Sequence, residues 1–409
     1  MPKKKGFVLK DSPQELIEAS GVEPKGRSYD VAYERKPGAV RIEDLLLGTK
    51  LACVAITDDE PDTLAKVGKM NPWHIKTLSM ICGSVEEAHK PLTHILETHF
   101  GLTVDKLINL TGWSGGHPID TQGFVAHDDD IIVVSFRCTT SALDWMTNFA
   151  ATSSEWEPDE DLDQGHSGFC SCLEGRWWGT NKPRVHTGFY NNILQTIPTF
   201  EEFVNPLLGP DQPPRTLYVV GHSLGAGMST MATIYFLEKF DWKTLPQKYV
   251  NISAGTPRSC KKAMADRMEE KLAELRPLDK AVVCRVVRDE DLVAKVPPRY
   301  VHIGKLVFLT EDGHVLVGPK LDDAHIIDEK EMKALCKDNP QLAAVAAVEE
   351  AAKEAAKEEE VGQRGVGGDG KKELTSYEKT MKKIPGFLRD HCPDYYLEPL
   401  VKLYGRDLE

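Results

Sequence analysis

A serine flanked by two glycines stands where an apolar run gives way to a long amphipathic segment. Gly221, Ser223 and Gly225 occupy alternate positions in the stretch LYVVGHSLGAGMSTMATIYF, residues 217–236. The run before the serine is rich in β-branched residues, and apolar residues recur at helical spacing after it. In a nucleophile elbow, a strand turns sharply into a helix, and the turn admits only very small neighbours around the serine. The pattern therefore predicts a serine nucleophile, with Gly221 and Gly225 as the glycines of the elbow.

A serine hydroxyl is a weak nucleophile, so it needs a base, and the base needs a carboxylate to orient it. In elbow proteins the acid and then the histidine follow the serine along the chain, each on a loop after a strand. A strand-like run ends at Val287 and is followed by Asp289, Glu290 and Asp291. Asp291 precedes an apolar pair and a Pro-Pro turn, which favours an inward side chain. The other two acids are expected in solvent.

Four histidines follow the acidic run: His302, His314, His325 and His391. His302 lies close after Asp291 in a strand-like segment, so we expect it to be structural. His325, in LDDAH, and His391, in LRDHCPDYYL, are the two candidates for the base. Residue chemistry alone does not separate them.

The elements around these residues alternate between strands and helices. The segment GFVAHDDDIIVVSF, residues 123–136, has two apolar runs about an Asp-rich turn, which predicts a hairpin. Further strands are expected at 217–220, 248–255 and 281–287, with helices at 188–204, after Ser223 and at 260–275. Residues 42–110 are expected to be mostly helical. Such alternation predicts an α/β fold with a mostly parallel central sheet flanked by helices on both faces.

We expect one domain at residues 46–409, preceded by an N-terminal extension at residues 1–45. Residues 151–184 break the regular pattern but carry several tryptophans, so they are expected to form a flap-like loop. Residues 342–373 contain LAAVAAVEEAAKEAAKEEE and a glycine-rich stretch, and we interpret them as a low-complexity acidic insertion.

Charge and composition narrow the classes of function. The net charge of −13 argues against a nucleic-acid partner, which requires a basic surface. Nine cysteines without metal-binding spacing indicate reduced thiols, and neither a metal nor an organic cofactor is expected. No apolar run reaches the length of a transmembrane segment, and no apolar stretch follows the basic N-terminus as in a signal peptide. These features predict a cytoplasmic protein.

Several motifs, taken together and in order, resemble the class 3, fungal-type lipase family over about residues 120–400. They are TQGFVAHDDDIIVVSFRCTTSALDW, VHTGFYNNI, YVVGHSLGAG, SAGTPRS, RVVRDEDLVAKVPPRYVHIG and DHCPDYYL. GHSLGAG and DHCPDYYL look most like the diacylglycerol-lipase-like branch. The resemblance implies an α/β-hydrolase fold and a catalytic triad of Ser223, Asp291 and His391. It thus favours His391 over His325 as the base.

The same resemblance implies an oxyanion hole. Its two backbone N–H groups would belong to Leu224, after the nucleophile, and to Thr139, in SFRCTT, where Arg137 matches the arginine of the family. This chain has Cys138 where the family has glycine. That departure puts the geometry of the hole in question if the glycine was needed for a positive φ.

The resemblance implies hydrolysis of acyl esters of glycerolipids, of the triacylglycerol or diacylglycerol lipase type, through an acyl-enzyme on Ser223. Phospholipase A1 or general carboxylesterase activity with the same triad stays open, as does a non-catalytic lipid-binding or scaffold role. The implied partner is a glycerolipid ester at a lipid–water interface. Peripheral contact with an internal membrane or a lipid droplet is compatible with this reading. His222 and His186 flank the expected site, and we expect both to serve in packing.

Overall fold

The computed structural model of this protein describes residues 37–57, 72–114, 117–138, 152–158, 182–288, 291–297, 299–310, 315–317 and 389–405. The segments predicted as an insertion at 342–373 and most of the flap at 151–184 lie outside these residues. So do Thr139, Asp289, Glu290, His314 and His325.

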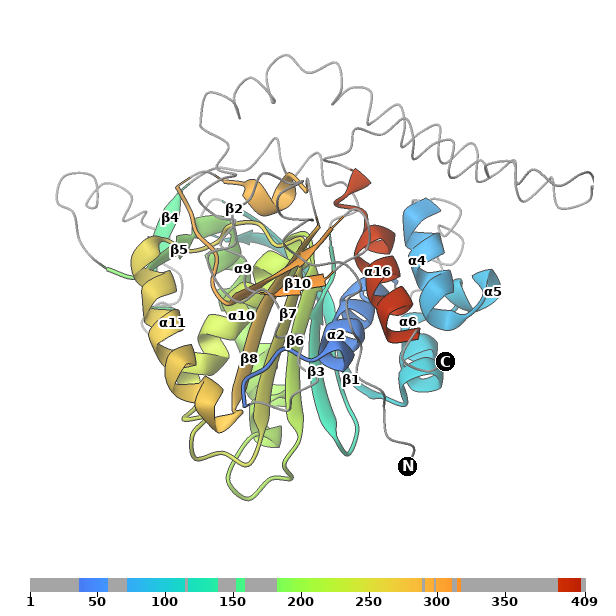
Figure 1. Ribbon diagram of the computed structural model, residues 1–409. Helices are drawn as coiled ribbons and strands as arrows, with labels where there is room; N and C mark the ends of the chain where they lie inside the picture. The colour runs from blue at the N-terminus through green and yellow to red at the C-terminus, as the bar shows by residue number, and fades with distance from the viewer. Residues whose placement is uncertain are drawn as a thin grey trace, which may run out of the picture.

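One sheet of eight strands runs through the molecule (Figure 1). In chain order the strands are β1 (Thr103–Ser114), β2 (His117–His127), β3 (Ile131–Phe136), β6 (Thr216–His222), β7 (Lys248–Ala254), β8 (Ala281–Arg288), β9 (Lys305–Leu309) and β10 (Val315–Val317). Their spatial order is β1-β2-β3-β6-β7-β8-β9-β10. Pairing is parallel from β3 to β9 and antiparallel at both margins, which confirms the mostly parallel sheet.

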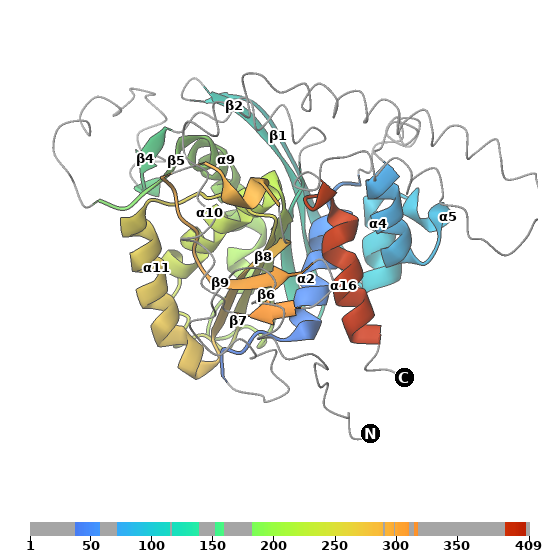
Figure 2. The same ribbon diagram turned by 45° about the horizontal axis from the view of Figure 1, so that its top comes forward.

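Helices cover both faces of this sheet. The longer ones are α2 (Ile42–Val54), α4 (Pro72–Cys82), α9 (Thr187–Phe203), α10 (Leu224–Lys239), α11 (Lys262–Leu275) and α16 (Pro393–Gly405). Short helical turns are α5 (Val85–Ala88), α6 (Leu92–Ile95), the π-helix η2 (Leu96–Phe100), η4 (Asn205–Leu207), η5 (Arg276–Leu278) and η6 (Val293–Lys295). Figures 1 and 2 show α9, α10 and α11 on one side of the sheet, and α2 and α16 on the other.

Alternate residues of the central strands pack in two separate hydrophobic cores, one on each face of the sheet. In β6, Leu217 and Val219 pack with α9, α10 and α11, whereas Tyr218 and Val220 pack with α2 and α16. A strand points successive side chains to opposite faces, so a mostly apolar run is needed where both faces are covered. Strands β3, β6, β7 and β8 are mostly apolar, and the buried polar side chains of Ser135, Asn251 and Ser253 within them form hydrogen bonds.

The predicted hairpin is confirmed as β2 and β3, whose antiparallel ladder pairs Gly123 with Phe136. The prediction that residues 42–110 are mostly helical is wrong from Thr103 onward, because β1 begins there. The pairing of β1 shifts register between Val104 and Lys106, and this irregularity interrupts the two-residue period of its side chains.

Two segment boundaries bear on the predicted organisation. Helix α2 begins at Ile42 and buries Leu45 and Leu51 against the sheet, so the chain enters the core slightly before the predicted boundary at residue 45. The two ends of the predicted flap segment pair as antiparallel strands β4 (Ser153–Glu155) and β5 (Arg184–His186). In the described part of the chain, no helix is both long and apolar enough to cross a bilayer.

Candidate active site

Ser223 lies at the sharp turn between β6 and α10, as the glycine spacing predicts. Its backbone has φ 59° and ψ −124°, a conformation that residues other than glycine rarely adopt. A Cβ on Gly221 would lie 2.1 Å from the carbonyl oxygen of Gly225, and a Cβ on Gly225 would lie 2.2 Å from that of Phe136. Both positions therefore require glycine, because a larger residue would force the strand, the helix and the end of β3 apart.

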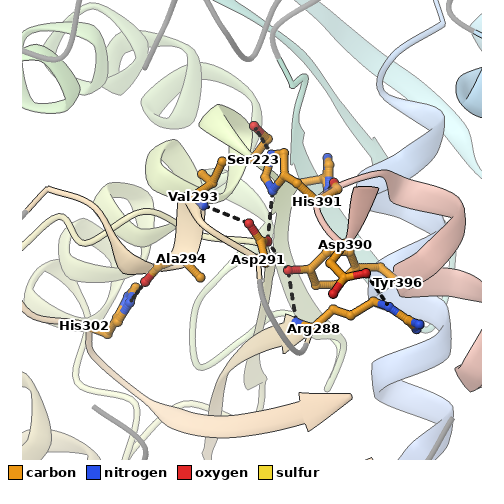
Figure 3. A network of polar contacts seen from close by, with 10 residues as sticks. Ser223, Arg288, Asp291, Val293, Ala294, His302, Asp390, His391 and Tyr396 are labelled. Carbon is orange, nitrogen blue, oxygen red and sulfur yellow. Dashed lines mark hydrogen bonds and ion pairs between the residues drawn. The ribbon is translucent and has the colours of Figure 1, made fainter. Parts of the chain in front are cut away.

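The structure brings Ser223, His391 and Asp291 into one hydrogen-bonded line (Figure 3). The Ser223 hydroxyl donates to Nε2 of His391 over 2.8 Å, and Nδ1 of His391 donates to Oδ2 of Asp291 over 2.9 Å. All three side chains are buried. In this arrangement the imidazole can accept the serine proton while the carboxylate fixes its tautomer and stabilises the imidazolium that forms.

The environment of Asp291 favours its charged form. Burial alone would raise the pKa of the carboxyl group, but the charge and hydrogen bond of His391 outweigh it, together with two further donors. These donors are the N–H of Val293, 2.8 Å from Oδ1, and the hydroxyl of Tyr396, which donates to Oδ2. The net result is a pKa below the usual range for aspartate.

Tyr396 was not singled out in the sequence, although it touches the same carboxylate oxygen as His391. Burial and the nearby charge of Asp291 raise its pKa well above the ordinary value, so the phenol stays protonated and donates. Its oxygen also accepts the N–H of Arg288 over 3.2 Å. Only the tyrosine pair in PDYY hinted at it, because its partners lie more than a hundred residues earlier in the chain.

Further contacts fix α16, and with it His391, against the body of the protein. The Arg288 guanidinium donates to the carbonyl of Tyr395 over 2.9 Å. At the other side of the helix, Lys76 of α4 forms a 2.9 Å ion pair with the buried carboxylate of Asp394. The position of the base is therefore set by β8 and α4 together.

Gly255, directly after β7, leaves the space in which the base and the acid meet. Its φ is +59°, and a Cβ there would lie 3.0 Å from Cε1 of His391 and 3.1 Å from Oδ2 of Asp291. The residue is part of the SAGTPRS motif, yet its position in the sequence alone did not reveal this role.

His222 packs beneath the base, as expected of a structural histidine. Its ring stacks on that of His391 with centroids 4.9 Å apart, and its Nε2 donates to the His391 carbonyl over 3.0 Å. Burial, with the nearby His391 next in effect, lowers the pKa of His222 well below its ordinary value. His222 is therefore neutral, and it holds both the backbone and the ring of the base.

Two further histidines near the expected site, His186 and His302, serve in packing. His186 is buried between Phe189 and Tyr300. His302 donates from Nε2 to the carbonyl of Ala294 over 2.9 Å, and burial lowers its pKa well below the ordinary value. It therefore supports the turn after Asp291, in agreement with the structural role predicted for it, although it follows a single bridge residue and lies outside any strand.

The expected oxyanion side is formed by the start of α10 and the end of β3. Leu224 is the first residue of α10, where helix geometry leaves the backbone N–H without a carbonyl partner in the helix. Among the described non-glycine residues, positive φ values occur at Ser223, Asp279 and Arg299, so Cys138 does not need the conformation that favours glycine. Thr139 lies outside the described residues.

Cys138 is buried just after the end of β3, with its Sγ 4.0 Å from Nε2 of His74 on α4. Burial raises the pKa of the thiol to about 11. Burial, aided by Arg137, lowers the pKa of His74 to about 3. Both groups are therefore uncharged at neutral pH, and the cysteine makes a contact with His74 that glycine would not make.

Part of this chain is similar to a known protein family. Residues 133–301 match the family model described as Lipase (class 3). This part of the chain is class 3 lipase sequence. It includes the elbow and Asp291, whereas His391 lies beyond the matched class 3 lipase region. The sheet order and the strand–serine–helix turn are those of the α/β-hydrolase fold.

A curated relative of this class 3 lipase region is phospholipase A(1) DAD1, chloroplastic, of Arabidopsis thaliana, 30% identical over 171 residues. The aligned part is 41% of this chain and 33% of the relative, so the chain spans about a third of that protein. Among solved structures, a mono- and diacylglycerol lipase from Aspergillus oryzae is 21% identical, with 72% of this chain and 94% of the other covered at a TM-score of 0.44. The Rhizomucor miehei triacylglyceride lipase is 17% identical, with 68% and 83% covered at a TM-score of 0.40.

Within the described residues, no group of three or more His, Cys, Asp or Glu side chains is arranged to hold a metal ion. The described cysteines, including Cys138, are buried as free thiols.

Proposed function

We propose that this protein hydrolyses carboxylic esters of glycerolipids through an acyl-enzyme on Ser223. The observation that carries the proposal is the continuous line of hydrogen bonds from the Ser223 hydroxyl through His391 to Asp291, at 2.8 Å and 2.9 Å. The class 3 lipase sequence of residues 133–301 supports the choice of an ester as substrate.

In the proposed reaction Ser223 Oγ attacks the ester carbonyl while His391 Nε2 takes its proton. The N–H groups of Leu224 and Thr139 stabilise the oxyanion of the tetrahedral intermediate. The intermediate collapses, and His391 returns the proton to the departing glycerolipid alcohol. Water then attacks the acyl-serine, with His391 again as base, and releases the fatty acid and free Ser223.

A series of p-nitrophenyl esters, from short to long acyl chains, tests the proposal. We expect Ser223→Ala and His391→Ala to lower kcat by roughly 10⁵- to 10⁶-fold, and His325→Ala to remain active. Thr139→Ala keeps the backbone N–H and removes only the side-chain hydroxyl, so a loss of rate with the fold retained would show that the hydroxyl also contributes to the oxyanion hole. Undiminished turnover by Ser223→Ala would end the proposal, and an active His391→Ala beside an inactive His325→Ala would move the base to His325.

Phospholipase A1 activity is the second candidate, and the likeness to phospholipase A(1) DAD1 favours it. The two activities are distinguished by comparing hydrolysis of diacylglycerol and of phosphatidylcholine, each with the same pair of different acyl chains at sn-1 and sn-2. Release of the sn-1 chain from phosphatidylcholine at a higher kcat/KM than from diacylglycerol would favour the phospholipase. The opposite preference would favour the diacylglycerol-lipase-like branch.

A non-catalytic lipid-binding or scaffold role is the remaining candidate, because Cys138 stands where the resembled family has glycine. A fluorophosphonate probe tests it, because only an activated serine reacts. We expect the wild type to be labelled and Ser223→Ala to be unlabelled. Absence of labelling in the folded wild type would favour the binding protein. We also propose a cytoplasmic location, which a fluorescent fusion of the full chain tests.

A further inference from the structure

The β1–β2 hairpin extends beyond its neighbours in the sheet (Figure 2). Strand β2 pairs with β3 over residues 123–127, whereas residues 117–122 continue as a two-stranded ladder with β1. Strand β3 ends at Phe136, opposite Gly221 of β6, and Ser223 follows directly after β6. The extension therefore rises past the sheet edge that carries the nucleophile, by about 20 Å at roughly 3.3 Å per residue.

Trp113 is the prominent residue near the end of this extension. Its side chain is 78% exposed, whereas Trp73, Trp156 and Trp242 are buried. The large exposed hydrophobic residues of the described chain are Val85, Trp113, Leu278 and Val301, so Trp113 is the aromatic one among them. A lone exposed indole does not contribute to the core, and tryptophan is the residue type that favours the boundary between lipid and water.

The sequence around Trp113 carries no charged side chain. Residues 107–119, LINLTGWSGGHPI, lack Asp, Glu, Lys and Arg, in a chain with 28% charged residues and a net charge of −13. Charged groups oppose transfer out of water, so their absence suits contact with lipid. The negative charge of the whole protein opposes an anionic membrane, so the fitting surface is uncharged or zwitterionic.

The base of the extension is fixed to the rest of the protein. Asn192 of α9 accepts at Oδ1 the N–H of Asp120 over 3.1 Å and the hydroxyl of Thr121 over 2.8 Å. The amide of Asn192 is itself held, because its Nδ2 donates to the carbonyl of Gly188 over 2.8 Å. Trp113 thus lies on an anchored two-stranded ribbon, at the same edge of the sheet as Ser223, where the parallel strands end.

We infer that residues 111–114, centred on Trp113, dock this protein on the surface of a zwitterionic or uncharged lipid phase. The inference rests on the proposed function, since it supplies aggregated glycerolipid to a serine that is only 3% exposed. Insertion of the indole at the interface brings the adjoining sheet edge, and the site on it, toward the lipid.

Sedimentation with dioleoylphosphatidylcholine vesicles tests this surface in the full chain. We expect Trp113→Ala to lower the partition coefficient about tenfold, the effect of removing one large apolar side chain from the interface. Leu278→Ala is the matched control, because Leu278 is 52% exposed and apolar but lies in η5, before β8 begins at the opposite sheet edge. It should bind vesicles as the wild type does.

Hydrolysis of monomeric p-nitrophenyl butyrate separates docking from chemistry. Trp113→Ala should keep the wild-type rate on this soluble ester and lose rate on lipid vesicles. Equal vesicle binding by Trp113→Ala and wild type, or no binding by wild type, would overturn the docking surface while leaving the hydrolase intact. A wild type that binds vesicles through Trp113 but cleaves no ester would support the surface and refute the proposed function. A wild-type dimer that Trp113→Ala converts to monomer would assign the surface to a second copy of the chain and overturn the inference.

Discussion

The two sides of the candidate site are built in different ways. On the acid–base side, Asp291, His391 and Tyr396 are joined by directional hydrogen bonds between buried groups. On the expected oxyanion side, the contacts around Cys138 are softer, with a thiol 4.0 Å from an uncharged imidazole. The first side depends on exact donors and acceptors, because the carboxylate of Asp291, the imidazole of His391 and the phenol of Tyr396 each have a specific partner to lose. The second side depends on close backbone packing at Gly225 and tolerates a change of side chain.

The largest expected effect separates two neighbouring carboxylates on the acid–base side. Asp291→Asn should lower kcat by about 10⁴-fold, because an amide does not hold the imidazole in the required tautomer. Asp390→Asn is the matched control, since Asp390 is buried beside Arg288, 3.6 Å from its Nε, one residue before His391. It should lower the Tm and keep kcat within about tenfold. Equal losses of kcat in both variants would contradict the role of Asp291.

A second comparison concerns space rather than charge. Gly255→Ala should lower kcat by about 100-fold, because the new methyl displaces His391 and Asp291 from their 2.9 Å contact. Gly101→Ala is matched in backbone, with φ +69°, but nothing lies within 4 Å of its added Cβ. Both variants should lose stability, by about 1 kcal/mol from the backbone alone. A Gly255→Ala variant with wild-type kcat would contradict this prediction, because it would show that the added methyl group does not displace His391 and Asp291.

Tyr396→Phe removes one donor to Asp291 and keeps the ring. We expect a loss of about tenfold in kcat/KM, the size of one hydrogen bond to a charged group. Because the donor favours the carboxylate, its loss raises the pKa of Asp291. The lowered pKa of Asp291 stabilises the fold at neutral pH, and this contribution disappears as the pH falls through that pKa. The Tm difference between wild type and variant should therefore be largest near pH 7 and shrink below about pH 4.

Tyr395→Phe is the control for this experiment. Arg288 contacts the backbone carbonyl of Tyr395, which the substitution preserves. It should show no pH-dependent difference in Tm through Asp291. If Tyr396→Phe lowers the Tm by the same amount at every pH, the hydroxyl contributes to packing and does not act through the charge of Asp291.

The smallest effect is expected on the oxyanion side. Cys138→Ala should change kcat by less than about threefold, because the thiol is uncharged with a pKa of about 11 and faces His74. Its Tm should fall by a few degrees from the lost contact. A loss of 100-fold or more in kcat would show that the thiol itself shapes the oxyanion hole, and the contrast between the two sides would fail.

The sequence predicted best where the signal was local. The elbow at Ser223 was predictable because its glycines lie within two residues of it, and the central strands because both of their faces are buried. Strand β1 was misassigned, since a half-exposed outer strand owes its conformation to the partner β2. The acid and the base could be assigned only through the family resemblance, because three acidic residues stand together at 289–291 and two histidines, His325 and His391, were candidates for the base. The roles of Tyr396 and Gly255 were not predicted, because they arise from contacts with residues distant in the chain.

His391 belongs to the segment that leads into α16 and follows Asp291 by 100 residues. During translation the nucleophile and the acid therefore leave the ribosome well before the base does. At about 5–20 residues per second, this interval lasts roughly 5–20 s. Throughout it the nascent chain holds an elbow serine without His391 as its proton acceptor. Synthesis order alone thus delays the proposed hydrolysis until the segment that leads into α16 has been made.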